Sequence, residues 1–137
     1  MCRKLLLIPI FSLMFVCSCR KIVEDKKKDF ILSFIASGDW HIEEFREGAS
    51  TITDQFTGFN FHFTKEGTVT AKKDNITENG TWVGDATNYT ITANFPTSPD
   101  PIKKLNQTWK LTDSSEETVI AETSGPDTKN TLRLRKN

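Results

Sequence analysis

Short runs in which apolar and polar residues alternate fill the chain from Gly38 onward, and they restrict its fold more than any other feature. Successive side chains of a β-strand point to opposite faces, so each run predicts a strand with one dry face and one wet face. Turn-forming pairs such as Glu66-Gly67 and Asn79-Gly80 separate several runs. The phase assigned to the dry face contains Trp40 and Ile42; Phe59, Phe61 and Phe63; Val69 and Ala71; Trp82; Tyr89, Ile91, Ala93 and Phe95; Leu105, Gln107, Trp109 and Leu111; Val119 and Ala121; and Leu132 and Leu134.

These runs predict an all-β fold of about eight short antiparallel strands. An apolar face that extends over so many strands needs a second layer or closure of the sheet on itself. The helical spacing of Phe30, Ile31, Phe34 and Ile35 before Gly38 predicts one short helix, which is too small to cover such a sheet. We therefore expect residues 30–137 to form one domain, an up-and-down barrel with a short N-terminal helix.

The chain starts with a secretory signal. Arg3 and Lys4 precede an apolar run, residues 5–16, that is shorter than the roughly 20 residues a membrane-spanning helix needs. The three cysteines, Cys2, Cys17 and Cys19, all lie within the first 19 residues, which leaves no thiol in the predicted barrel for a disulfide, a zinc site or a nucleophile. We expect residues 1–18 to be removed, and the charge-dense residues 19–29 to form a tether.

The residues around the expected cleavage site resemble the signal of bacterial lipoproteins. Val16-Cys17-Ser18 before Cys19 has the aliphatic, variable and small positions of that signal, whereas Cys17 follows bulky residues. The resemblance implies that Cys19 carries acyl chains that anchor the protein to a membrane. Arg20 after the lipidated position implies the outer membrane, with the leaflet left open. An ordinary signal peptide is the alternative.

The start of the first strand, Gly38-Asp39-Trp40, resembles the lipocalins. The wider pattern, "SGDWHI", "FNFHFTKEGTVTA", "ENGTWVG", "LNQTWKLT" and "TLRLRK", is similar to small lipocalin-like domains of bacterial envelope lipoproteins. The resemblance implies that Gly38 and Trp40 close one end of the barrel, and that Arg133 or Arg135 lies over the Trp40 ring in a cation–π contact.

An eight-stranded barrel either fills its interior with side chains or holds one small ligand. We therefore expect a lipid-anchored, monomeric, non-enzymatic envelope protein that binds a small apolar or amphipathic molecule. The alternative is a filled barrel whose loops, residues 46–57 and 95–104, dock an envelope protein. The candidate ligand-binding residues, at the inner face or barrel mouth, are Trp40, Phe59, Phe61, Phe63, Trp82, Tyr89, Phe95 and Trp109.

The remaining patterns argue against other functions. Eighteen basic residues balance 18 acidic residues, so no nucleic-acid partner is expected. His41, Glu43 and His62 share the polar phase of neighbouring runs and are candidate zinc ligands, but they have no metal-binding spacing. Neither a Gly-x-Ser-x-Gly motif nor a phosphate-binding glycine loop occurs in the sequence. We therefore predict no catalytic residues, no metal and no cofactor.

Overall fold

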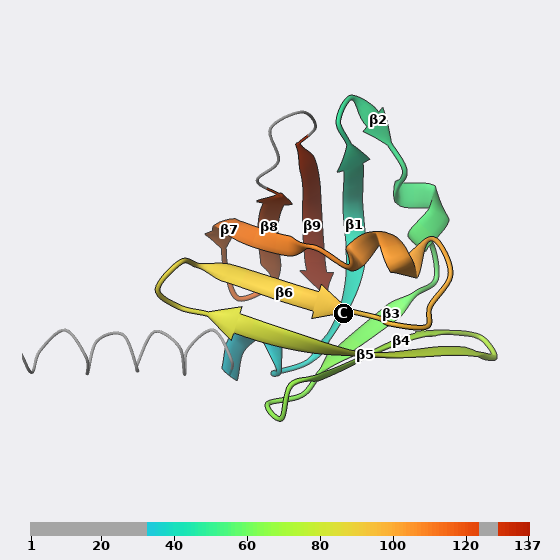
Figure 1. Cartoon of the computed structure of the whole chain (residues 1–137), viewed down its shortest axis with the longest axis horizontal. Coiled ribbons are helices and arrows are strands. Elements are labelled where there is room, and N and C mark those ends of the chain that lie inside the picture. Colours follow the sequence, from blue (N-terminus) through green and yellow to red (C-terminus); the bar gives the residue numbers. More distant parts are fainter. Residues whose placement is uncertain (1–32, 124–128) are drawn as a thin grey trace, which may run out of the picture.

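A closed β-barrel forms the body of the computed structural model, which describes residues 33–123 and 129–137 (Figure 1). In this part of the chain nine strands form one antiparallel sheet, and β1 pairs with both β3 and β9, which closes the sheet on itself. The two-residue β2 adds to the end of β1, so eight strands make the wall. The strands are β1 (Asp39–Glu47), β2 (Ser50–Thr51), β3 (Asn60–Phe63), β4 (Thr68–Lys73), β5 (Ile76–Asp85), β6 (Thr90–Asn94), β7 (Thr108–Ser114), β8 (Thr118–Thr123) and β9 (Asn130–Lys136).

The up-and-down order confirms the predicted fold class. From β3 to β9 each strand pairs with the next along the chain, and the dry phase of the alternating pattern lies inside. Gly67 adopts a φ of 93° in the β3–β4 turn, a conformation that glycine reaches without steric cost. The expected turn at Asn79-Gly80 is wrong, because both residues lie within β5 and the chain turns at Asp74 and Asn75 instead.

Gly80 has a packing role rather than a turning role. A Cβ at this position would lie 2.5 Å from the backbone oxygen of Asn94 and 2.8 Å from the Phe95 ring. The missing side chain therefore lets β6 and the start of the following connection approach β5 closely.

One end of the barrel, which we call the floor end, is covered by the segment before β1. Residues 33–35 are helical and are followed by a turn that leads to Gly38. This agrees with the end of the predicted helix; its residues 30–32 lie outside the described part, as do the signal peptide, Cys19 and the tether. Ile35 is 1% exposed and packs into the core below Trp40. Among the described residues no helix is long and apolar enough to span a membrane.

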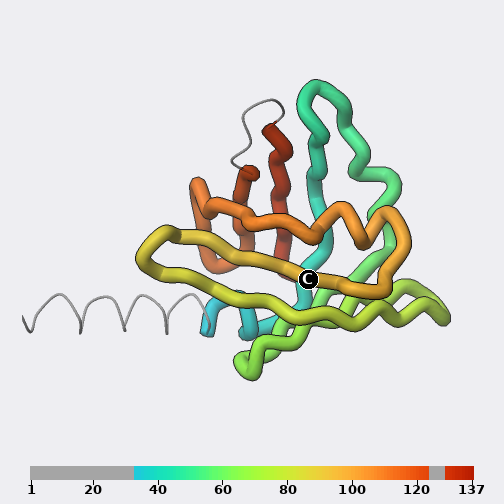
Figure 2. The backbone as a smooth tube through the Cα atoms, in the orientation of Figure 1, coloured from blue at the N-terminus to red at the C-terminus, as the bar shows by residue number. Residues whose placement is uncertain are grey.

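The opposite end, which we call the roof end, is covered by two 3₁₀ helices, η1 (Thr53–Phe56) and η2 (Ile102–Leu105). Their apolar side chains, Phe56, Ile102 and Leu105, are 2%, 1% and 5% exposed. In the backbone trace the η1 and η2 connections lie in the same region (Figure 2). Lys104 of η2 pairs with Glu47 at the end of β1. Both connections were expected to be loops, but each one inserts apolar side chains into the barrel end.

Candidate functional site: the barrel interior and its two ends

Trp40 lies at the floor end of the barrel. Its side chain is fully buried, and its indole N–H donates a hydrogen bond to the carbonyl of Ile35 at 2.9 Å. The ring of Phe34 meets it edge to face, with the ring centroids 5.4 Å apart. Trp40 therefore fixes the short N-terminal helix against the floor end.

Lys136 supplies the basic group over this tryptophan. Its Nζ lies 5.6 Å from the centre of the Trp40 ring and 5.8 Å from that of Phe34. The Nζ also donates a hydrogen bond to the Ser37 hydroxyl at 2.7 Å. A Cβ on Gly38 would lie 2.7 Å from the Lys136 side chain, so the glycine leaves room for it.

The expectation that Arg133 or Arg135 covers Trp40 is wrong. Both arginines are exposed, and Arg135 Nη1 lies 3.1 Å from Glu43 on the outer wall. Side chains alternate along β9, so Leu132, Leu134 and position 136 share the inner phase while the arginines point outward. The same alternation can be followed in the sequence, where it places Lys136 on the inner phase and so predicts it as the basic residue near Trp40.

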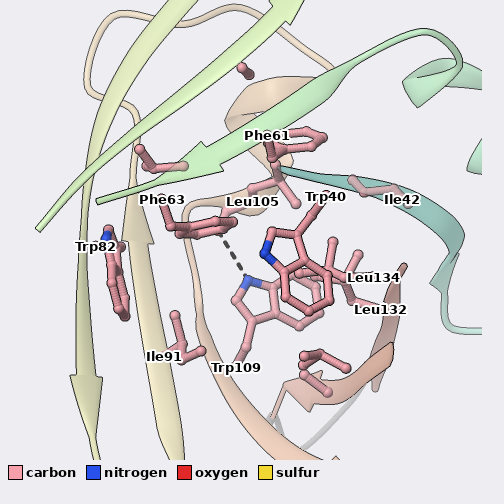
Figure 3. Packing of buried hydrophobic residues seen from close by; sticks show 14 of the residues in the cluster. Trp40, Ile42, Phe61, Phe63, Trp82, Ile91, Leu105, Trp109, Leu132 and Leu134 are labelled. Atoms are coloured by element: carbon pink, nitrogen blue, oxygen red, sulfur yellow. Dashed lines mark hydrogen bonds between the residues drawn. The ribbon is translucent and has the colours of Figure 1, made fainter. Parts of the chain in front are cut away.

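Most of the predicted ligand-binding aromatic residues do lie inside the barrel. Figure 3 shows Trp40, Phe61, Phe63, Trp82 and Trp109 converging on the interior. Phe59 and Phe95 are also buried, at 6% and 2% exposure.

Tyr89 is the exception, because it does not lie on the inner face. It is 44% exposed and has a φ of 54° in the β5–β6 turn, just before β6 begins. The left-handed backbone breaks the strand alternation that had placed Tyr89 on the dry face.

The interior aromatic residues bind one another and the backbone. The indole N–H groups of Trp82 and Trp109 donate to the carbonyls of Thr64 and Leu105, at 2.9 Å and 3.1 Å. The Trp82 ring meets Phe63 edge to face with centroids 5.6 Å apart. Buried indoles normally need such partners, so these tryptophans have the surroundings of core residues.

Two further aromatic residues, Phe45 and Phe56, were missed by the sequence reading. Their rings stack with centroids 5.0 Å apart, and Phe45 also meets Trp109 at 5.6 Å. A β-bulge between Ile42 and Glu44 shifts the alternation in β1, which is why Phe45 points inward.

The space left in the interior is small. A cavity of about 50 Å³ remains inside the barrel, and its lining includes Ile42, Phe61, Ile91, Ala121 and Leu134. An apolar cavity of about 150 Å³ accommodates benzene, and pockets for larger small molecules occupy about 300–1,000 Å³. The interior thus has the volume of a packing defect rather than of a lipid-binding chamber.

The candidate zinc ligands have other partners. His62 Nδ1 lies 2.7 Å from Asp39 Oδ1, and Glu43 pairs with Arg135. Within the described ranges, no group of three or more His, Cys, Asp or Glu side chains is arranged to hold a metal ion.

The two connections at the roof end are joined by an ion pair. Lys104 Nζ in η2 donates to Glu47 Oε1 at the end of β1, at 2.5 Å. This hydrogen bond raises the pKa of Lys104 above its ordinary value of 10.5. The lysine therefore stays charged at neutral pH, and it fixes η2 next to the start of the β1–β3 connection.

Together these features define a small, closed, up-and-down antiparallel β-barrel whose interior is packed. The structure is similar to the crystal structure of a DUF4847 family protein from Bacteroides vulgatus ATCC 8482, with a TM-score of 0.60 and 22% sequence identity. The matched region covers 78% of this chain and 97% of that protein. At this identity the likeness shows a shared fold. No protein-family model matches the sequence, and no curated protein matches it.

Proposed function

We propose that this protein is a lipid-anchored, non-enzymatic component of a bacterial cell envelope, in which a filled barrel supports binding surfaces on its outside. The observation that carries this proposal is the interior cavity of about 50 Å³, closed at both ends by buried apolar side chains. It favours the interaction module over the carrier of an apolar molecule.

The energy needed to open the interior supports this choice. Enlarging the cavity of about 50 Å³ to the lower limit of small-molecule pockets, about 300 Å³, would create about 250 Å³ of empty space. At about 24 cal/mol per Å³, this costs about 6 kcal/mol. Such a cost is comparable with the whole stability of an ordinary domain, about 5–15 kcal/mol. A ligand would have to supply that energy before any net binding.

The position of the chain ends relative to the barrel suggests where a partner would dock. The described chain begins at Ser33, on the floor end beside Phe34 and Lys136. If Cys19 carries the acyl anchor, the floor end is the one nearer the membrane. The η1 and η2 connections then lie at the far end of the barrel, where an envelope protein has access to residues 46–57 and 95–104.

Native mass spectrometry tests whether the barrel is filled. The mature chain carrying Cys19→Ala would be incubated with palmitate, oleate and a lipid extract of its host. We expect the unliganded mass throughout. The control variant Ala121→Val adds two methyl groups into the small cavity. A stoichiometric lipid complex that this variant loses would refute the filled barrel and establish a carrier.

The lipid anchor is tested separately by radiolabelled palmitate and membrane fractionation. Cys19→Ala should abolish labelling and release the protein from membranes, because it removes the acylated thiol. Cys17→Ala should leave both unchanged, because this residue leaves with the signal peptide. Equal loss in both variants would contradict the assignment of Cys19.

A further inference from the structure

A groove opens in the barrel wall where β1 and β3 separate. The two strands pair only at Asp39 with His62 and at Trp40 with Phe61, and β1 then continues beyond β3. The η1 connection crosses the resulting gap. The groove has a volume of about 390 Å³, within the range of about 300–1,000 Å³ that small-molecule sites occupy. It shares the η1 connection with the roof end, but it opens on the side of the barrel wall, and among the described residues none of η2 lines it.

The bottom of the groove is apolar. Ile42, Phe56 and Phe59 line it, and they are only 6%, 2% and 6% exposed, so they present edges to the groove while their bodies pack in the core. Ile42 also lines the interior cavity, which makes the wall one side chain thick at this point.

The rim of the groove is polar and ordered by hydrogen bonds. His41 Nδ1 lies 2.5 Å from Asn137 Oδ1, and the Asn137 amide nitrogen donates to Asn60 Oδ1. Asn60 Nδ2 in turn donates to Asp39 Oδ2 at 3.3 Å. Because the side-chain oxygen of Asn137 can only accept, His41 Nδ1 is the donor in this contact. Each amide nitrogen keeps a second N–H for another partner.

The hydroxyl groups of the η1 connection complete the rim. Thr53 Oγ1 accepts a hydrogen bond from the Phe45 backbone N–H at 3.0 Å, which holds its side chain in place and leaves its own O–H as a donor. Thr57 is exposed beside it and also lines the groove.

The charge of this lining selects the ligand class. Among the described residues, His41 is the only ionisable side chain that lines the groove. The nearby charges are balanced, because the Asp39 carboxylate lies behind the amide chain and Lys73 Nζ lies 5.5 Å from the centre of the Phe59 ring, so the surroundings favour neither an anion nor a cation. Pre-oriented donors and acceptors around an apolar floor match a molecule with many hydroxyl groups and apolar C–H faces.

We propose that this groove binds a neutral saccharide of one or two sugar rings on the outer wall of the barrel. The amide and imidazole groups of Asn60, Asn137 and His41 bond the sugar hydroxyls, and the ring faces lie against Ile42 and Phe59. The inference does not depend on the lipid anchor or on a filled interior.

Amide-resolved NMR titration of the mature Cys19→Ala chain tests this site. The probes are glucose, galactose, mannose, N-acetylglucosamine and their disaccharides, at about 10 mM, which nearly saturates a site with a Kd of about 1 mM. We expect at least one neutral sugar to shift the amide signals of residues 41–42 and 53–60, with the signals of the roof end connection 95–104 unchanged. Glucose 6-phosphate and glucosamine serve as charged probes and should bind at least several-fold more weakly.

Matched variants separate the groove from the rest of the wall. Asn60→Ala removes a rim amide and should weaken binding about tenfold, the effect of one or two lost hydrogen bonds. Thr57→Val removes a rim hydroxyl at almost constant shape and should weaken binding less. The control Asn94→Ala removes an exposed amide on β6 and should leave the Kd unchanged. The same spectra report whether each variant is folded.

Several outcomes would overturn the proposal. These are the absence of shifts with every neutral sugar, shifts scattered over the surface, equal binding by the Asn60→Ala variant, or tighter binding of either charged probe. None of them bears on the lipid titration that tests the filled barrel, so the two proposals can fail separately.

Discussion

Replacement of Trp40 by alanine gives the sharpest test of how the barrel is closed. Removal of a buried Trp or Phe side chain costs about 3–5 kcal/mol, including the cavity that remains. Trp40 is 0% exposed, and its loss also leaves the Ile35 carbonyl without the indole donor 2.9 Å away, a further cost of about 1 kcal/mol. The free energy of unfolding should therefore fall by about 4–6 kcal/mol.

Urea unfolding followed by far-UV circular dichroism measures this loss, with the slope m showing whether the unfolding reaction is unchanged. The conservative variant Trp40→Phe keeps most of the ring but not the N–H, and it should cost about 1–3 kcal/mol. It also preserves the test if the alanine variant does not fold. A loss below about 1 kcal/mol for Trp40→Ala would refute the placement of this residue at the barrel base.

Three further substitutions test the packing by the same unfolding measurement. Gly80→Ala should lower the free energy of unfolding by about 1–3 kcal/mol, because the new Cβ would lie 2.5 Å from a backbone oxygen. The control Val83→Ala, on the exposed face of the same strand, should change it little. Equal losses in the two variants would contradict the close approach of the backbone at Gly80. Lys136→Met should lower the free energy of unfolding by about 0.5–1 kcal/mol, because the cation–π contact with Trp40 is lost, whereas Arg133→Met should leave it unchanged. A larger loss for Arg133→Met would indicate that the arginine covers Trp40 instead. Ala121→Val should raise the free energy of unfolding by about 0.5–2 kcal/mol, because the larger side chain fills the interior cavity. A decrease in the free energy of unfolding would show that the interior has no space for it.

The alternating pattern was sufficient to predict the barrel because strand periodicity is a local property. The dry positions of β3, β4, β8 and β9 are the buried positions of the structure. An unbroken alternation also determines which residues face outward, and it would have placed Lys136 correctly in β9 if it had been followed to the end of the strand.

Local patterns failed where the backbone departs from regular strand geometry. The bulges in β1 and β7 each add a residue, and this changes which side chains point inward. No glycine or proline lies within residues 42–45 to mark the bulge. Similarly, Asn79-Gly80 has the composition of a hairpin turn, but tertiary packing against β6 requires the glycine within a strand.

The question of whether the barrel carries a ligand depends on residues outside the strands. The same inward-facing aromatic residues could line a chamber or a packed core, so counting them does not separate a carrier from a scaffold. The difference lies in the connections that place Phe56, Ile102 and Leu105 in the roof end. No periodicity shows that a residue in a connection will insert into a barrel, because such insertion depends on the space left by distant strands. In a small barrel, the apolar residues of the connections therefore decide between the two functions, and substituting them is the direct way to convert one into the other.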